Sequence, residues 1–299
     1  MMRFQHLPQA DLRYFIGVDG GGSGTRVRVT DAAGDPVGAA EAGPSALGQG
    51  IEQAWQHVQA AIERAFADAG LPHPEPAQCA IGLGLAGAHS PARCDAFLNA
   101  APAYGRLALD TDAGTALLGA HGGAPGAIVA AGTGSVGEAL RRNGQRVSVG
   151  GWGFGIGDEG SGAWLGLAAM RIAHRALDGR ASAGPLARAV WRVAGGQRDA
   201  LLDWCVRAGQ HGFARLAPLV FDNADADGAA RRLLDEAVQA LVEMAEALDP
   251  AGDLPLVLTG SVAQRLKPAL PPSLLARCVA PQGDAVAGAL LLARESRAL

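Results

Sequence analysis

FIGVDGGGSGTRVRVTD, at residues 15–31, holds the most informative pattern in this sequence of 299 residues. A short apolar run ends in Asp19, and four glycines fall within the next five positions. The residues after Thr25 alternate between apolar and polar, which is typical of a half-buried strand. The glycines are therefore predicted to join two strands, where convergent backbone N–H groups and the Ser23 hydroxyl could hold an anion.

Other glycine-rich loops do not fit this segment. The dinucleotide fingerprint needs a helix after its glycines, and the P-loop needs a Lys-Ser/Thr pair that opens a helix. A strand follows here instead. A glycine hairpin that holds phosphate and an ordinary wide turn that binds nothing both remain open.

The same succession recurs at residues 127–151, AIVAAGTGSVGEALRRNGQRVSVGG. It reads strand, glycine loop, strand, turn, strand, and Asn143-Gly144 is a strong hairpin signal. Gly132 to Gly137 satisfies G-x-G-x-x-G, but strand-like residues follow it and argue against a dinucleotide site. Two meanders of this kind predict a duplicated fold with a cleft between the halves.

The remaining segments alternate between strand and helix patterns, which predicts an α/β fold with parallel strands added to each meander. Strands are predicted at 37–43, 79–87, 106–110 and 276–280, and residues 254–263 are predicted to be a strand that runs into a Gly-Ser turn. Helices are predicted at 51–69, 92–100, 161–177, 184–194, 197–208, 211–220, 226–248 and 283–296.

Composition narrows the class of protein. The net charge of −4 gives no reason to expect a nucleic-acid partner. No apolar run approaches the length of a membrane span, and the first residues lack the apolar segment of a secretory signal. The widely spaced cysteines predict free thiols in a cytoplasmic protein; they are Cys79, Cys94, Cys205 and Cys278.

Polar residues beside glycines follow several predicted strands, where ligands bind in open α/β sheets. Asp112 follows the strand at 106–110, and its position suits either catalysis or a helix N-cap. Asp158 lies ahead of the helix at 161, and its position likewise suits either a functional role or a helix N-cap. It lies in GGWGFGIGDEGSG, residues 150–162, whose glycines would let a backbone approach a ligand closely. Trp152 in this loop could lie against a sugar ring or anchor the loop in the core.

Five of these motifs occur together in an order that resembles a known family. They are VDGGGSGT (18–25), TDAGTA (111–116), GTGS (132–135), GGWGFGIGDEGS (150–161) and TGSV (259–262). The chain resembles the N-acetylglucosamine kinases and related BadF-type ATPases of the sugar kinase, Hsp70 and actin superfamily. The resemblance covers nearly the whole chain.

The resemblance implies two ribonuclease-H-like α/β domains of the actin-like ATPase fold, with ATP and sugar in a central interdomain cleft. The expected N-terminal domain is 1–115, and the C-terminal helix 284–299 is a candidate to complete it. The expected larger C-terminal domain is 116–283.

The resemblance also implies roles for individual residues. Asp112 matches the general base, and Asp19 matches the acid that places Mg²⁺ through water. Gly151, Trp152 and Asp158 match contacts to the amino sugar, and Ser45 could replace an Asn that the family uses there. The positions expected to bind ATP are Gly21, Gly22, Ser23, Thr25, Gly132, Thr133, Gly134, Ser135, Gly260 and Ser261.

The implied activity is ATP-dependent phosphorylation of N-acetylglucosamine or glucosamine at the 6-hydroxyl, with ATP and Mg²⁺ as cofactors. Phosphoryl transfer needs positioned phosphates, a metal ion and an acidic residue for the nucleophile, and the motifs offer these groups. The alternatives are an ATPase that activates a dehydratase or reductase, and a non-catalytic regulator that binds sugar or nucleotide. A homodimer is left open.

Overall fold

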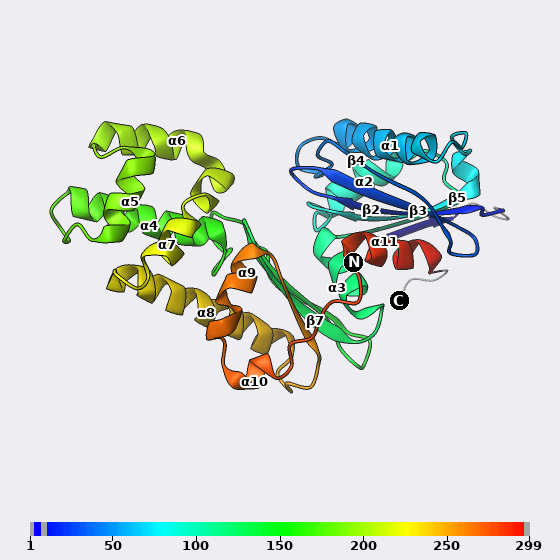
Figure 1. The fold of residues 1–299 in the computed structure, drawn as a ribbon. Helices are drawn as coiled ribbons and strands as arrows, with labels where there is room; N and C mark the ends of the chain where they lie inside the picture. The colour runs from blue at the N-terminus through cyan, green and yellow to red at the C-terminus, as the bar shows by residue number, and fades with distance from the viewer. Residues whose placement is uncertain (1–2, 7–10, 296–299) are drawn as a thin grey trace. The chain divides into compact units, whose positions relative to one another are not determined.

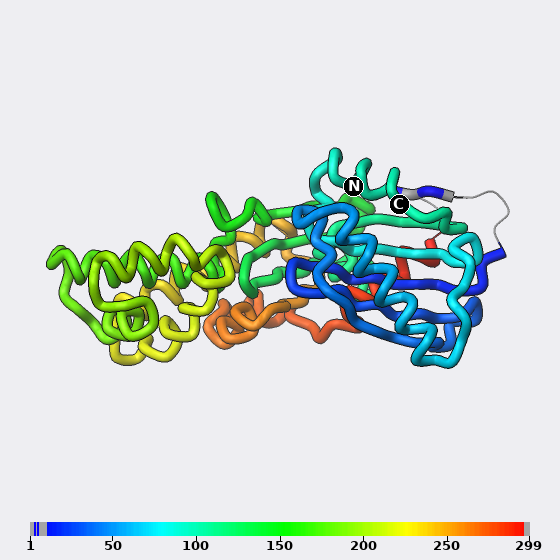
Figure 2. Tube along the Cα trace, turned by 90° about the horizontal axis from the view of Figure 1, so that it is seen from above, coloured from blue at the N-terminus to red at the C-terminus, as the bar shows by residue number. Residues whose placement is uncertain are grey.

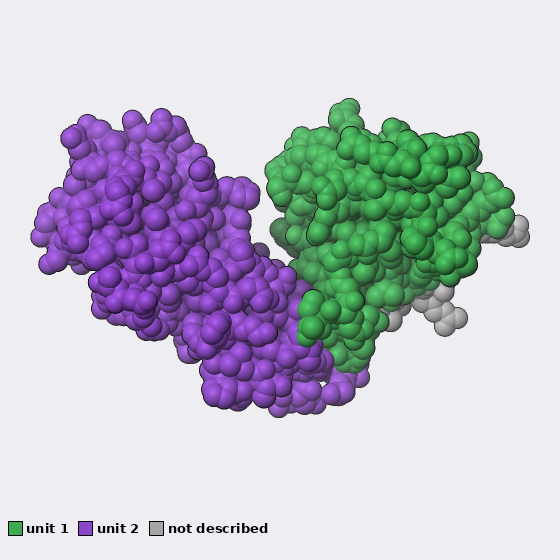
Figure 3. All heavy atoms as spheres, in the orientation of Figure 1, with its two compact units in different colours: residues 1–126, 280–299 green, residues 127–279 purple. Residues whose placement is uncertain are grey.

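The computed structural model describes residues 3–6 and 11–295. The chain forms two compact units (Figures 1 and 3). Unit 1 contains residues 1–126 and 280–299, and unit 2 contains residues 127–279. The predicted α/β class with two domains is confirmed, because each unit is built on its own sheet.

Unit 1 contains a six-stranded sheet. Its strand order is β1 (Arg3–His6), β6 (Arg106–Asp110), β5 (Cys79–Leu85), β2 (Tyr14–Gly20), β3 (Thr25–Asp31), β4 (Pro36–Ala42). The meander β2–β3–β4 is antiparallel, whereas β5 and β6 run parallel to β2. The carboxyl ends of β2, β5 and β6 therefore meet at one edge, which brings Asp19 and the segment after Asp110 to the same edge.

Helices cover both faces of this sheet (Figures 1 and 2). One face carries α1 (Ile51–Asp68) and α2 (Pro91–Asn99), whose apolar sides share a core with the strands. The other carries α3 (Asp112–His121) and α11 (Ala285–Arg294). A 3₁₀ turn at Pro76–Gln78 leads into β5.

Glycines allow α11 to lie unusually close to the sheet. A Cβ atom on Gly82 of β5 would lie 2.0 Å from the Ala289 carbonyl oxygen, and one on Gly17 of β2 would lie 2.5 Å from that of Val286. Because α3 packs against α11 through the similarly crowded Gly119 and Gly288, it belongs to unit 1. The units accordingly divide at residue 126 rather than at 115.

Unit 2 contains a four-stranded sheet and most of the helices. Its strand order is β10 (Leu256–Thr259), β7 (Gly126–Ala131), β8 (Ser135–Leu140), β9 (Arg146–Gly150), with β10 parallel to β7. The helices are α4 (Gly162–Leu177), α5 (Pro185–Ala194), α6 (Arg198–Ala214), α7 (Ala217–Asn223), α8 (Gly228–Leu248), α9 (Ser261–Leu266) and α10 (Pro272–Leu275), with a 3₁₀ turn at Lys267–Ala269. Within this unit α8 packs on β8 and β9, and α4 to α7 gather beyond one end of the sheet (Figure 1).

The structure corrects several sequence-based boundaries. The prediction for 254–263, a strand that runs into a Gly-Ser turn, is confirmed: β10 ends at Thr259, Gly260 turns the chain with φ of 89°, and Ser261 opens α9. At 276–280 there is no strand but an isolated bridge between Leu256 and Cys278. The helices predicted at 197–208 and 211–220 instead form α6, which breaks at Gly209, and α7.

Two further features concern the ends of the chain and its helices. The strand β1, which pairs antiparallel with β6, was not predicted. Within the described part of the chain, no helix is both long enough and apolar enough to cross a bilayer. The predicted closing helix at 283–296 is present as α11, and residue 296 lies outside the described residues.

Candidate functional site

The first glycine loop is a tight turn between β2 and β3. The Gly21 N–H donates to the Gly24 carbonyl at 2.9 Å, and the N–H groups of Ser45 and Ala46 donate to the Gly21 carbonyl. Gly22 and Ser23 are exposed at its tip. Their backbone and hydroxyl donors are therefore accessible to an anion.

Two of the predicted ligand-binding hydroxyls lie inside unit 1 instead. Ser45 is fully buried and Thr25 nearly so. The Thr25 hydroxyl lies 2.6 Å from the Gly43 carbonyl oxygen and 2.7 Å from the Ser45 hydroxyl. Because these bonds satisfy both hydroxyls within the protein, we infer that Ser45 and Thr25 stabilise the packing of residues 43–45 against β3. Ser45 has no exposed surface with which to replace the family's sugar-binding Asn.

Asp19 is the second-to-last residue of β2 and lies beside a polar hollow of about 420 Å³. We call this space the Asp19 hollow; it is lined by Asp19, Gly21, Ser23, Gly24, Thr25, Arg26, Glu41 and Ala42. Asp19 Oδ2 accepts hydrogen bonds from Arg26 Nη2 at 2.5 Å and from Arg26 Nε at 3.1 Å. The Asp19 and Glu41 carboxylates beside the exposed Ser23 hydroxyl fit Mg²⁺ that arrives with phosphates, since this ion uses one or two carboxylates and keeps several waters. The described residues contain no cluster of three metal-binding side chains.

Asp112 is the first residue of α3, and it does not cap this helix. The N-cap is Thr111, whose hydroxyl accepts a hydrogen bond from the Gly114 N–H at 2.9 Å. Burial raises the pKa of Asp112, and the charge of Asp19 raises it further, while a hydrogen bond from the Ala113 backbone opposes the rise. A carboxylate with a raised pKa is suited to accept a proton.

The second glycine loop, Gly132 to Ser135, lies on the start of α4. The Gly132 N–H donates to the Gly134 carbonyl at 2.9 Å, which repeats the turn of the first loop. The Gly162 and Ala163 N–H groups donate to the carbonyls of Gly132 and Thr133. Thr133 is partly exposed, whereas the buried Ser135 hydroxyl donates to the Glu159 carbonyl at 2.7 Å. Thr133 is therefore the hydroxyl of this loop that a ligand can reach.

Asp158 holds this loop in place from within unit 2. It is only 4% exposed, and its carboxylate accepts from the Ser135 N–H at 3.3 Å and from Gln210 Nε2 at 2.8 Å. Among the described residues it is the non-glycine residue with positive φ, at 61°. Burial raises the pKa of Asp158, which the Ser135 N–H opposes. The helix cap is Ser161 rather than Asp158, because Ser161 accepts from the Trp164 N–H.

The loop before Asp158 presents apolar surface to solvent. Trp152 is 75% exposed and Ile156 is 80% exposed, so Trp152 does not anchor the loop in the core. The flanking Gly151 and Gly153 both have positive φ. The indole face is thus accessible to a ligand.

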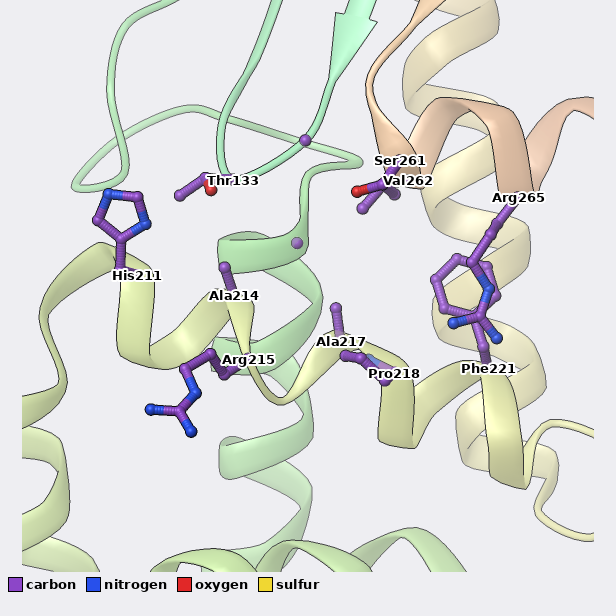
Figure 4. A pocket seen from close by; sticks show the side chains of 12 residues that line it. Thr133, His211, Ala214, Arg215, Ala217, Pro218, Phe221, Ser261, Val262 and Arg265 are labelled. Atoms are coloured by element: carbon purple, nitrogen blue, oxygen red, sulfur yellow. The ribbon is translucent and has the colours of Figure 1, made fainter. Parts of the chain in front are cut away.

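A pocket of about 330 Å³ in unit 2 brings together predicted and unpredicted residues (Figure 4). We call it the Thr133 pocket; it is lined by Gly132, Thr133, Gly162, His211, Ala214, Arg215, Ala217, Pro218, Phe221, Ser261, Val262 and Arg265. Thr133 and Ser261 lie on one side, and the small residues Ala214, Ala217 and Pro218 lie opposite (Figure 4). Gly260 holds the TGSV turn against the loop, since a Cβ there would lie 2.4 Å from the Ala131 carbonyl oxygen.

The charge and shape of the Thr133 pocket suit a nucleotide. It is lined by His211, Arg215 and Arg265, and no carboxylate of the described residues lines it. The Arg265 guanidinium lies 4.0 Å from the centroid of the Phe221 ring and 3.3 Å from Asp222. Cationic groups favour phosphates, and stacked planar groups favour a nucleobase.

The structure thus brings several predicted residues together at one place in each unit. Asp19, Gly21 and Ser23 share the Asp19 hollow, while Gly132, Thr133 and Ser261 share the Thr133 pocket. Sequence reasoning missed four lining residues from α6, α7, α9 and the C-cap of α6, namely His211, Phe221, Arg265 and Arg215. None of them belongs to a glycine motif, and no local pattern distinguishes them from other helix surface residues.

Comparisons with known proteins give one family and full-length relatives. Residues 16–293 match the model of the BadF/BadG/BcrA/BcrD ATPase family. The chain is 35% identical over 283 residues to a glucosamine kinase of Vibrio cholerae, covering 94% of this chain and 96% of that protein. It is 31% identical over 173 residues to an N-acetylmuramic acid/N-acetylglucosamine kinase of Clostridium acetobutylicum, which covers 56% of each chain.

A crystal structure from Chromobacterium violaceum is similar over almost the whole molecule. It was solved for a protein provisionally named an N-acetylglucosamine kinase, and it is 51% identical to this chain with a TM-score of 0.90. The match covers 95% of this chain and 100% of that chain.

Proposed function

The chain belongs to the BadF/BadG/BcrA/BcrD ATPase family, and from this premise we propose that it is an ATP-dependent amino-sugar kinase. The proposed acceptor is the 6-hydroxyl of glucosamine or N-acetylglucosamine. Full-length similarity to a protein named glucosamine kinase supports the reaction class. The observation that carries the mechanism concerns Asp112. Its carboxylate has a raised pKa, and the neighbouring Thr111, not Asp112, caps α3.

Asp112 acts as the general base in this proposal. As the sugar 6-oxygen attacks the γ-phosphorus of ATP, the O–P bond to ADP breaks and the hydroxyl proton passes to the Asp112 carboxylate. The raised pKa of Asp112 favours this transfer, because proton transfer is most effective when the pKa of the base approaches the working pH.

The nucleotide is assigned to groups from both glycine loops. The Thr133 pocket would take the nucleoside, with Gly132, Thr133 and Ser261 as donors and Arg265 stacked on the base. Gly21, Gly22 and Ser23 would donate to phosphate oxygens. Bound Mg²⁺ would neutralise charge on the phosphates, with Asp19 as the residue that holds it through water.

The amino sugar is assigned to the exposed loop of unit 2. Gly151 and Trp152 would contact the sugar, because the Trp152 indole is exposed on a glycine-flanked segment. Asp158 would keep this loop in shape and complete the contact. Excluding water from the acceptor would limit ATP hydrolysis.

The test is ADP release in the presence of ATP and a panel of sugars. Asp112→Asn is expected to bind ATP normally and to lose at least about two orders of magnitude in kcat. The exposed Asp68→Asn serves as the matched control and is expected to behave like the native chain. Near-normal sugar phosphorylation by Asp112→Asn would refute the proposed base.

The same assay separates the alternatives. Sugar-independent ADP release with a bound iron–sulfur cluster would favour an ATPase that activates a dehydratase or reductase. Sugar binding without turnover would favour a regulator.

A further inference from the structure

Arg26 and Asp19 form a cross-strand ion pair at the mouth of the first glycine loop. They are directly opposed in the antiparallel register of β2 and β3, so their side chains lie on the same face of the sheet. Both Nε and Nη2 of Arg26 donate to the one oxygen Asp19 Oδ2. The hydrogen bond to Asp19 raises the pKa of Arg26, so the guanidinium is charged at every working pH.

The pair belongs to a row of three charges that lines the Asp19 hollow. Arg26 is also opposed in register to Glu41 of β4, and all three residues line the hollow. Two carboxylates and one guanidinium leave this row with net negative charge. Of these three charges, Asp19 and Glu41 would repel an approaching polyphosphate, and Arg26 would attract it.

The side chains differ in how freely they can rearrange. The Arg26 side chain is 52% exposed, whereas that of Asp19 is only 17% exposed. An ion pair with a solvent-exposed partner is held weakly, and a long Arg side chain changes rotamer readily. Phosphate oxygens accept paired hydrogen bonds from a guanidinium, so a bound nucleotide can compete with Asp19 for Arg26.

We propose that Arg26 is a phosphate-binding residue that covers Asp19 until the nucleotide arrives. When ATP enters the Asp19 hollow, the guanidinium turns from Asp19 Oδ2 to the phosphate oxygens. The uncovered carboxylate then faces the metal ion that accompanies the nucleotide. The arrangement prevents Asp19 from binding a divalent cation without ATP. The proposal rests on the proposed use of ATP, and it does not depend on the identity of the sugar.

The experiment compares Arg26→Gln with Arg28→Gln in the full chain. Arg28 is the matched control because it lies on the same strand and pairs with Asp284 at 3.0 Å, but does not line the hollow. The first readout is Mn²⁺ binding to the nucleotide-free protein by electron paramagnetic resonance. Arg26→Gln is expected to bind Mn²⁺ at least about fivefold more tightly, because two unit charges about 4 Å apart interact by about 1 kcal/mol in water and the divalent ion is repelled more strongly than that.

The second readout is calorimetric binding of a non-hydrolysable ATP analogue with Mg²⁺. Arg26→Gln is expected to bind this analogue about tenfold more weakly, because charged hydrogen bonds to phosphate are lost. Arg28→Gln is expected to match the native chain in both readouts. Adding Asp19→Asn to Arg26→Gln is expected to abolish the gain in Mn²⁺ binding.

Either of two results would overturn the proposal. One is Mn²⁺ binding by Arg26→Gln no tighter than by Arg28→Gln, and the other is unchanged affinity for the analogue. If Arg26→Gln does not fold, Arg26→Lys keeps the charge but loses the planar fork, and its analogue affinity is expected to fall. A chain that shows both shifts but phosphorylates no sugar would refute the kinase proposal and leave this one standing.

Discussion

At the scale of single residues, Thr111 and Asp112 show how neighbouring polar side chains take different roles. Position alone made Asp112 a candidate for both a helix cap and a catalytic base. The structure assigns the cap to Thr111, whose hydroxyl bonds the Gly114 N–H. Asp112 is left with a raised pKa, which costs the folded state free energy when the group is ionised.

The raised pKa of Asp112 predicts two linked pH effects. Because the base must be ionised, the acidic limb of the kcat/KM profile is expected above the ordinary Asp pKa of about 3.9. The folded state holds the Asp112 proton more tightly than the unfolded state, so this group's contribution to stability falls as the pH rises through the raised pKa. Asp112→Asn removes that cost and is expected to raise the unfolding temperature at pH 7.

Calorimetry over a pH series measures the second effect. The gain from Asp112→Asn should shrink as the pH approaches the ordinary Asp pKa, while Asp68→Asn should show no such trend. An Asp112→Asn chain less stable than the native chain at pH 7 would contradict the assignment.

Gln210 is predicted to be a positioning residue for Asp158. Gln210→Ala removes a hydrogen bond to a buried carboxylate and is expected to lower the free energy of unfolding by about 1.5–3 kcal/mol. Denaturant unfolding measures this loss, and the KM for the sugar should rise with it. Gln239→Ala is the control, because its amide bonds Glu243 on the exposed side of α8, and its effect should stay within about 0.5 kcal/mol. Equal losses in the two variants would argue against the role.

At the scale of elements, close packing rather than turn formation explains several of the 43 glycines. Gly82 is in a fully buried strand, and α11 crosses it so closely that there is no room for a Cβ. Sequence reasoning predicted β5 and α11 as separate elements correctly. It did not predict that the two elements are in contact, because the residue pattern of one segment does not specify its distance from the other.

Gly82→Ala tests this contact. Its Cβ would lie 2.0 Å from the backbone oxygen of Ala289, which only a shift of α11 can relieve. We expect a loss of about 1–3 kcal/mol or more in the free energy of unfolding. Gly228→Ala is the control, because its Cβ would lie 3.7 Å from the flexible Arg232 side chain, and it should be neutral or slightly stabilising. Similar stability in the two variants would show that α11 adapts easily.

At the scale of the whole molecule, unit 1 is built from both ends of the chain. Residues 280–299 return to the unit that residues 1–126 begin, and α11 packs on β2, β5 and α3. Unit 2 is formed from one continuous segment with its own core. The two units should therefore differ in whether they fold as fragments.

We expect fragment 127–279 to unfold cooperatively on its own and fragment 1–126 to lack a cooperative transition. Fragment 1–126 without α11 would expose the apolar face of its sheet. Adding a peptide of residues 280–299 should restore the transition, as circular dichroism can measure. Cooperative unfolding of fragment 1–126 without the peptide would contradict the expectation.

Several features of the fold could be predicted from local patterns in the chain. Glycine loops flanked by alternating residues specified the meanders β2–β3–β4 and β7–β8–β9, and the apolar stripe of residues 51–69 specified α1. Motif order indicated the family, and the matched model agrees with it. These inferences succeeded because backbone conformation and amphipathic periodicity depend on residues close together in the chain.

Contacts between residues far apart in the chain could not be predicted and are known from the fold alone. It buried Ser45 against Thr25, paired Arg26 with Asp19, and lined the Thr133 pocket with side chains from α6, α7 and α9. Such contacts depend on how whole elements pack, and packing depends on many apolar and steric interactions at once. No short stretch of sequence specifies all of these interactions, so this part of the site could not be predicted from local patterns.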